Sequence, residues 1–157
     1  MATKILFVCL GNICRSPAAE GIFNQKIKDR GLENLFLVDS AGTGGWHVGN
    51  LADSRMREIA LSRGVQLTSR SRQIEENDLY KFDHILVMDK DNLHAVKSLI
   101  QDPLNPVNYK IKLILSYSKD SQLDEVPDPY YGGQNGFDKV LDLLDNAIDG
   151  LLDSLTD

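Results

Sequence analysis

Cys9 and Arg15 are the residues whose types and spacing most clearly suggest chemistry. Five residues separate them, and the stretch lies between an apolar run at Ile5–Val8 and a helix start at Ser16. A loop between a strand and a helix N-terminus directs backbone N–H groups and the positive end of the helix dipole toward one point. That setting favours the thiolate form of Cys9, and the planar guanidinium of Arg15 matches two phosphate oxygens. The pattern therefore predicts a nucleophilic attack by Cys9 on phosphorus.

The residues between Cys9 and the helix are suited to cradle a phosphate. Gly11 allows a close backbone approach, and Asn12 tolerates a left-handed conformation better than other non-glycine residues. Ser16 is expected to cap the helix, with Pro17 and a carboxylate in the first turn, and it can also donate a hydrogen bond to the Cys9 sulfur. No Gly-Lys-Ser/Thr follows the glycine, so a nucleotide-binding P-loop is not supported. The predicted cradle comprises Leu10, Gly11, Asn12, Ile13, Cys14 and Ser16.

The elements that must position this loop alternate along the chain. Strand-like apolar runs lie at 5–9, 35–39, 84–88 and 111–115, and helical spacing lies at 16–31, 52–63, 75–81, 92–100 and 137–155. This alternation predicts an α/β fold in one domain, residues 1–157, with a central four-stranded parallel sheet, helices on both faces and the phosphate-binding loop after strand 1. The long connections at 41–51, 101–110 and 116–135 are candidate binding loops.

Composition narrows the class of protein. The chain has 157 residues, 42% of them apolar and 25% charged, which is typical of one globular domain. Two cysteines are too few for a disulfide-stapled secreted module, and no apolar run is long enough for a signal peptide or a membrane span. We therefore expect a cytoplasmic, monomeric protein that binds neither nucleic acid nor membrane.

The net charge of −6 is unevenly distributed. Residues 1–119 hold 16 basic and 13 acidic groups, whereas residues 120–157 hold 1 basic and 10 acidic groups. Most of the acidic excess recurs at helical spacing on one face, which we expect to be solvated: Asp138, Asp142, Asp145, Asp149 and Asp153. The arginines between residues 53 and 73 are likewise expected to be surface residues: Arg55, Arg57, Arg63, Arg70 and Arg72.

Three segments together resemble one known family. Val8–Pro17 resembles the signature loop of the low-molecular-weight protein tyrosine phosphatases, Asp128–Tyr131 resembles their general-acid loop, and Asp39–Thr43 resembles their second-strand segment. The resemblance implies a phosphomonoester hydrolase that removes phosphate from protein tyrosine through a phosphocysteine. It makes Cys9 the nucleophile and Arg15 the phosphate clamp, and it implies no cofactor and no metal.

The resemblance also implies roles outside the loop. Asp128, between two prolines, would act as general acid and base, which requires burial or nearby negative charge to keep it protonated. Trp46, Tyr130 and Tyr131 would form aromatic pocket walls for phosphotyrosine proteins or aryl phosphates. Ser40 would support the loop. Many relatives carry a histidine at the position of Ser69, where it steadies the loop with the equivalents of Asn12, Ser16 and Ser40.

Several alternatives remain open. Thioredoxin-linked arsenate reductases share the Cys-x5-Arg loop but need two further cysteines, and none follows Cys14. Relatives that act on phosphoarginine tend to carry threonine at the position of Ile13 and lack the tyrosine pair. Small aryl or acyl phosphates are also candidate substrates, and a non-catalytic phosphate-binding module is a third class. From spacing alone, Cys9 could be an inert core residue.

Cys14 is a candidate redox partner of Cys9. Five residues apart in a curled loop, the two can lie within the Cα separation that a disulfide requires, about 4.4–6.8 Å. We expect a reversible Cys9–Cys14 disulfide that protects the nucleophile from over-oxidation. The alternative role for Cys14 is a small buried apolar residue.

Overall fold

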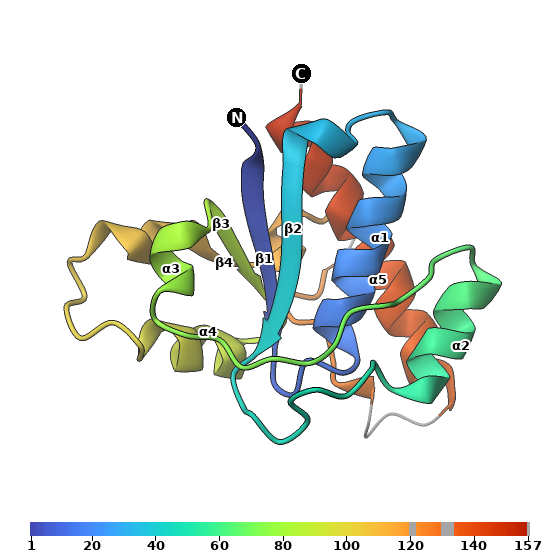
Figure 1. The fold of residues 1–157 in the computed structure, drawn as a ribbon, viewed down its shortest axis with the longest axis horizontal. Helices are drawn as coiled ribbons and strands as arrows, with labels where there is room; N and C mark the ends of the chain where they lie inside the picture. Colours follow the sequence, from blue (N-terminus) through green and yellow to red (C-terminus); the bar gives the residue numbers. More distant parts are fainter. Residues whose placement is uncertain (120–121, 130–133, 157) are drawn as a thin grey trace.

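A four-stranded parallel sheet forms the centre of the computed structural model, which describes residues 1–119, 122–129 and 134–156 (Figure 1). The strand order is β2-β1-β3-β4. The strands are β1 (Thr3–Cys9), β2 (Phe36–Gly42), β3 (His84–Val87) and β4 (Ile111–Leu113). The central residues of β1 and β3 are apolar and buried because helices cover both faces of the sheet. The predicted α/β class and parallel sheet are confirmed.

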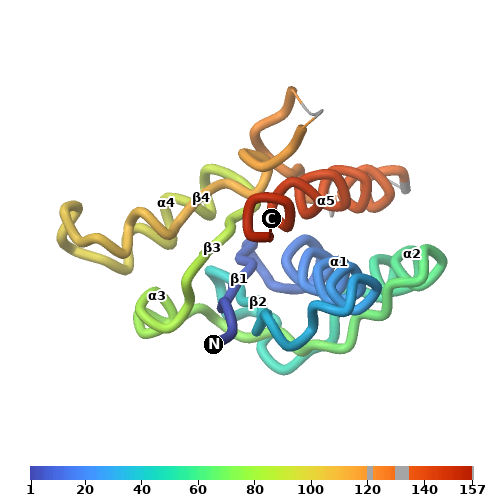
Figure 2. The backbone as a smooth tube through the Cα atoms, turned by 90° about the horizontal axis from the view of Figure 1, so that it is seen from above, coloured from blue at the N-terminus to red at the C-terminus, as the bar shows by residue number. Residues whose placement is uncertain are grey.

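The helices form two layers, one on each face of the sheet (Figure 2). They are α1 (Arg15–Asp29), α2 (Ser54–Ser62), α3 (Asp78–Lys81), α4 (Lys90–Lys97) and α5 (Gln134–Leu155). Short 3₁₀ helices span Glu33–Leu35, Pro106–Lys110 and Ile114–Tyr117. Helices α1, α2 and α5 lie on one side of the sheet, and α3 and α4 lie on the other. No helix in the described part of the chain is long and apolar enough to cross a membrane.

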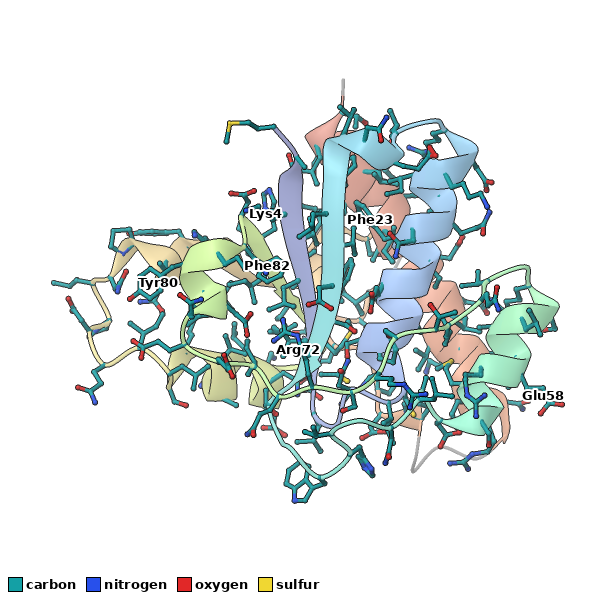
Figure 3. The ribbon with its side chains drawn as sticks, viewed as in Figure 1. Lys4, Phe23, Glu58, Arg72, Tyr80 and Phe82 are labelled. Carbon is teal, nitrogen blue, oxygen red and sulfur yellow. The ribbon has the colours of Figure 1, made fainter. Side chains whose placement is uncertain are left out.

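Alternating side chains of β1 supply two separate cores. Ile5 and Phe7 pack with the α1 and α5 side, whereas Leu6 and Val8 pack with the α3 and α4 side, and all four are fully buried. This follows from the period of two along a strand. On the first side Phe23 of α1, labelled in Figure 3, lies in the core between that helix and the sheet. Burial on both faces holds the carboxyl end of β1 in a fixed position.

The strand order places the end of β1 at a switch point. From β1 the chain passes through α1 to β2 on one side, and the next strand, β3, pairs with β1 on the other side. In open α/β sheets, ligands bind at the carboxyl ends of the strands where the order reverses. The loop after β1 therefore occupies the expected ligand position.

Three predicted boundaries were wrong for local reasons. Helix α1 begins at Arg15 with Cys14 as its N-cap and no acidic residue in its first turn, so Ser16 is not the cap. Helix α4 begins earlier than predicted because Asp89 and Asn92 form a capping box. The last strand ends at Leu113, where the chain turns into the 3₁₀ helix Ile114–Tyr117.

The acidic face of α5 is exposed to solvent, and its residues also form ion pairs that the sequence did not indicate. Lys26 on α1 pairs with Asp145 and Asp149 at 2.9 Å, and Arg63 after α2 pairs with Asp138 and Asp142 at 2.7 Å. The acidic residues therefore join α5 to the two helices beside it. Arg72, another member of the predicted arginine surface, instead pairs with Asp39 and Asp78.

Candidate active site

The loop between β1 and α1 turns its carbonyl groups outward. Four of these carbonyl groups accept hydrogen bonds from neighbouring segments. After β2, Thr43 N–H donates to the Cys9 carbonyl and Gly44 N–H to the Leu10 carbonyl, both at 2.9 Å. Before α2, Asp53 N–H donates to the Ile13 carbonyl at 2.7 Å, and before α3 the Ser71 hydroxyl donates to the Gly11 carbonyl at 3.0 Å. In a trans peptide the C=O and N–H point in opposite directions. Loop peptides held outward by their carbonyls therefore direct N–H groups inward, over Cys9.

Asn12 is the hub of the loop. Its φ of 57° is left-handed, as expected from its residue type, and its side chain is buried. The side-chain amide donates to Ser16 Oγ at 2.7 Å and to Ser40 Oγ at 3.0 Å, while its oxygen accepts from the Arg72 backbone at 3.0 Å. The predicted supporting role of Ser40 is consistent with this contact.

Cys9 lies at the floor of the loop, 2% exposed. Its sulfur is 3.0 Å from Ser16 Oγ and accepts from the Asn12 backbone N–H at 3.3 Å. Ser16 Oγ accepts from Asn12, and its own hydroxyl proton has two acceptors within reach, the sulfur at 3.0 Å and the Ala41 carbonyl at 3.4 Å. These contacts stabilise a thiolate, and they explain why Ser16 does not cap α1.

Arg15 is almost fully buried and is held by two segments that lie far from it in the chain. Its Nη1 donates to Asp89 at 2.6 Å and to the Val126 carbonyl at 3.0 Å. Burial alone would lower the pKa of Arg15, but the Cys9 sulfur, Asp89 and Asp128 raise it above its usual value. The guanidinium therefore remains charged beside the loop, as a phosphate clamp requires.

The segment that carries Asp128 is anchored next to Arg15. Val126 N–H donates to the carbonyl of Met88 at 2.8 Å, and Glu125 accepts from the Lys90 backbone at 2.8 Å. These bonds bring Asp128 Oδ2 to 3.7 Å from Arg15 Nη2, with 28% of the Asp128 side chain exposed. The general-acid candidate thus lies at the same pocket as the nucleophile candidate.

A cavity of about 250 Å³ opens above Cys9 and is also lined by Arg15, Asp128, Trp46 and His47. Trp46 is 72% exposed, with its indole against Gly44 at the rim. The structure therefore places Trp46 at this cavity, and its role as a wall for the substrate stays a prediction. Tyr130 and Tyr131, the other two predicted walls, lie outside the described residues.

Gly42 is required where β2 meets the loop. A Cβ at this position would lie 2.9 Å from the Leu10 carbonyl oxygen and 3.1 Å from Asn12 N. Backbone atoms cannot give way as a flexible side chain can. The bare glycine lets β2 approach closely enough for the next residues to bond the loop carbonyls.

Sequence reasoning missed Asp89 and Glu20. Asp89 lies two residues after the end of β3, and carboxyl ends of neighbouring parallel strands converge, so its position was a usable signal. Glu20 lies four residues after Ser16 on α1, and this spacing places both side chains on one face of the helix. The Glu20 carboxyl group accepts a hydrogen bond from the Ser40 hydroxyl at 2.6 Å. Ser69, at the histidine position of relatives, also bonds Glu20.

Comparison with known proteins agrees with this geometry. Residues 4–157 match the family described as low molecular weight phosphotyrosine protein phosphatase. The low molecular weight protein-tyrosine-phosphatase YfkJ of Bacillus subtilis is 42% identical, over 97% of this chain and 95% of its own.

Solved structures extend the likeness to the fold. A protein tyrosine phosphatase from Entamoeba histolytica superposes with a TM-score of 0.93 at 42% identity, covering 98% of this chain and 97% of its own. DARP, a Drosophila arginine phosphatase, superposes with a TM-score of 0.90 at 31% identity, covering 99% of each chain. With the family match spanning nearly the whole sequence, the chain belongs to the low molecular weight phosphotyrosine protein phosphatases.

Proposed function

We propose that this protein hydrolyses phosphotyrosine in proteins, with Cys9 as nucleophile, Arg15 as phosphate clamp and Asp128 as general acid and base. The observation that carries the proposal is that all three residues line one cavity. A loop with inward N–H groups surrounds the Cys9 sulfur there, and Arg15 lies 3.7 Å from Asp128.

In the first step the Cys9 thiolate attacks phosphorus, and the bond from phosphorus to the phenolic oxygen breaks. The Asp128 proton passes to that oxygen, so the phenol leaves as a neutral molecule. Negative charge on the three equatorial phosphoryl oxygens is held by the loop N–H groups and by Arg15.

In the second step water attacks the phosphocysteine. The Asp128 carboxylate takes a proton from that water, the phosphorus–sulfur bond breaks, and inorganic phosphate leaves. The thiolate of Cys9 is regenerated, stabilised by Ser16 and by the Asn12 N–H. No step requires a further reactant.

Phosphotyrosine is the substrate class that the pocket supports best. Ile13 and the exposed Trp46 offer apolar and aromatic surface to a phenyl ring. The likeness to DARP makes phosphoarginine the second candidate. Peptides that differ only in carrying phosphotyrosine or phosphoarginine separate the two: we expect a higher kcat/KM for phosphotyrosine, and a preference for phosphoarginine would reverse the assignment.

We also propose that the protein acts as a monomer in the cytoplasm. A thiolate nucleophile must stay reduced, which favours a reducing compartment, and both cysteines are free thiols. All three proposed catalytic residues come from one chain. Sedimentation in the presence and absence of inorganic phosphate measures the oligomeric state, and activity confined to a dimer would contradict this proposal.

Hydrolysis of aryl phosphates tests the catalytic roles. Cys9→Ser should reduce kcat roughly 10⁴-fold or more, whereas Cys14→Ser in the same loop should retain turnover. Asp128→Ala should reduce kcat roughly 10²-fold or more for phenyl phosphate and less for a dinitrophenyl ester, whose leaving group needs no proton. Asp124→Ala, which removes an exposed acid of the same segment, is the matched control. Appreciable turnover by Cys9→Ser would falsify the covalent mechanism.

A further inference from the structure

A second cavity lies behind the phosphate loop, between α1 and residues 66–69. Its volume is about 220 Å³, and it shares no lining residue with the cavity above Cys9. The polar part of its wall comes from Glu20, Asn24, Gln66, Thr68 and Ser69. Glu20 is the charged residue among those that line it, and the two catalytic steps above do not use it.

Glu20 lies in surroundings that do not balance a negative charge on its carboxyl group. Burial raises the pKa of its carboxyl group, and nearby Asp39 raises it more than Arg72 lowers it. Arg72, labelled in Figure 3, forms ion pairs with other carboxylates, Asp39 at 3.1 Å and Asp78 at 3.0 Å. In residues 1–119, 122–129 and 134–156, no ion pair includes Glu20. Ser40 and Ser69 supply neutral hydrogen bonds.

We propose that this cavity binds a guanidinium group, with the Glu20 carboxylate as its counterion. The planar N–H donors of guanidinium match a carboxylate, and Gln66 and Thr68, whose side chains carry further acceptor oxygens, line the same cavity. The local excess of negative charge selects a cation over a neutral amide of the same shape. A free guanidinium compound and an arginine side chain of a partner share this chemistry.

The site is connected to the nucleophile by four hydrogen bonds. Ser40 donates to Glu20, Asn12 donates to Ser40 and to Ser16, and Ser16 contacts the Cys9 sulfur. A positive charge at the Glu20 end stabilises negative charge at the sulfur end. Occupation of the cavity should therefore make the Cys9 sulfur more reactive toward an electrophile. This consequence rests on the proposed function only in naming Cys9 as the nucleophile.

Calorimetric titration tests the site itself. N-acetyl-arginine amide and methylguanidinium should bind, whereas N-acetyl-citrulline amide, the neutral isostere, should not. Glu20→Gln removes the counterion, and Asn24→Trp places an indole at the exposed mouth without touching the hydrogen-bond chain; both should abolish binding. Binding of methylguanidinium alone would assign the site to a free compound, and binding of both would admit an arginine side chain. Equal binding of citrulline, or unchanged binding by both variants, would overturn the proposal.

Alkylation of Cys9 tests the connection without any phosphate ester, so its failure is distinguishable from failure of the proposed function. In a Cys14→Ala background, saturating methylguanidinium chloride should accelerate iodoacetamide alkylation about twofold over equimolar sodium chloride, as expected for a charge acting through a partly screened interior. The same protein carrying Asn24→Trp should show no acceleration. Equal acceleration in that variant would contradict an effect transmitted from this cavity.

Discussion

A single arginine in the phosphate loop depends on a carboxylate that the chain supplies much later. Arg15 is buried, and a buried guanidinium is costly unless it is paired and hydrogen-bonded. Asp89 pairs with it at 2.6 Å and also caps α4 by accepting from the Asn92 backbone at 2.8 Å. The same carboxylate therefore sets the start of a helix and the orientation of the clamp.

Asp89→Asn separates these two tasks. The amide oxygen of asparagine can still cap α4, but it cannot neutralise Arg15, so the guanidinium should lose its fixed orientation toward phosphate. We expect kcat/KM for an aryl phosphate to fall roughly tenfold or more, with a parallel rise in the inhibition constant of inorganic phosphate. Asp91→Asn, in the first turn of the same helix, is the control. An inhibition constant that is unchanged in Asp89→Asn would contradict the role.

Cys14, the second cysteine of the loop, should react slowly as a nucleophile at neutral pH because its thiol stays protonated. Burial and then Asp53, with smaller contributions from Cys9 and Asp128, raise the pKa of the Cys14 thiol to about 12. Closure of a disulfide requires the Cys14 thiolate to attack an oxidised Cys9 sulfur. The raised pKa leaves little Cys14 thiolate at neutral pH. As long as the pH is below that pKa, the thiolate fraction grows about tenfold for each unit by which the pH rises.

Disulfide closure after peroxide treatment should therefore accelerate with pH up to about 12. Asp53→Asn removes a charge that raises the Cys14 pKa, so closure should be faster than in the wild type at any given pH. Mass spectrometry of quenched samples measures the rate. In Cys14→Ala, a thiol reductant should restore less activity than in the wild type after the same oxidation, and equal recovery would refute protection by Cys14.

At the scale of elements, the end of β2 shapes the phosphate loop. Gly42→Ala would press a methyl group against the Leu10 carbonyl oxygen at 2.9 Å, and only a backbone shift can relieve the contact. We expect a loss of about 1–3 kcal/mol in the free energy of unfolding, together with reduced kcat as the loop N–H groups are displaced. Urea unfolding and steady-state kinetics measure the two effects.

Gly136→Ala provides the comparison within the same chain. A Cβ there meets Pro129 at 3.5 Å, an ordinary contact, and the residue lies in α5 where alanine favours the helix. Its stability and kcat should be preserved. Equal losses in the two variants would mean that the close approach of β2 is not the cause.

The elements themselves were predictable from sequence because each carries a local signal. Apolar runs marked the strands, and the Gly11-Asn12 turn marked the loop. Contacts distant in the chain had no such signal: Arg15 and Asp89 are 74 residues apart. The error at Ser16 has the same origin, since its hydroxyl bonds Asn12 and Cys9 in the folded loop instead of capping a helix.

Across the whole molecule, the uneven charge of the sequence becomes a set of helix-to-helix contacts. The acidic C-terminal region lies along α5, and cations of the earlier region face it from α1 and from the end of α2. The charge separation visible in the sequence therefore aligns α5 against the two helices that it covers. It also keeps those carboxylates away from the cavity above Cys9, whose lining includes Asp128 but none of the α5 acids.

Lys26→Met tests this account of α5. The Lys26 amine bridges Asp145 and Asp149 at 2.9 Å, and although burial opposes it, hydrogen bonds to both raise the pKa of Lys26 above its usual 10.5. The contribution is therefore present at neutral pH and is lost as the pH rises through that raised value. We expect a loss of about 1 kcal/mol at low salt with unchanged kcat.

Lys28→Met, on the same helix and outside the ion pairs of the described residues, should change stability by no more than about 0.5 kcal/mol. Urea unfolding at low salt and in 1 M NaCl decides the mechanism, because a Debye length of about 3 Å screens exposed charges. The difference between Lys26→Met and the wild type should shrink at high salt. Lys26 is half-buried, so its methylene stem also packs against neighbouring residues. A stability difference of the same size at both salt concentrations would assign the effect to this packing and not to the ion pairs.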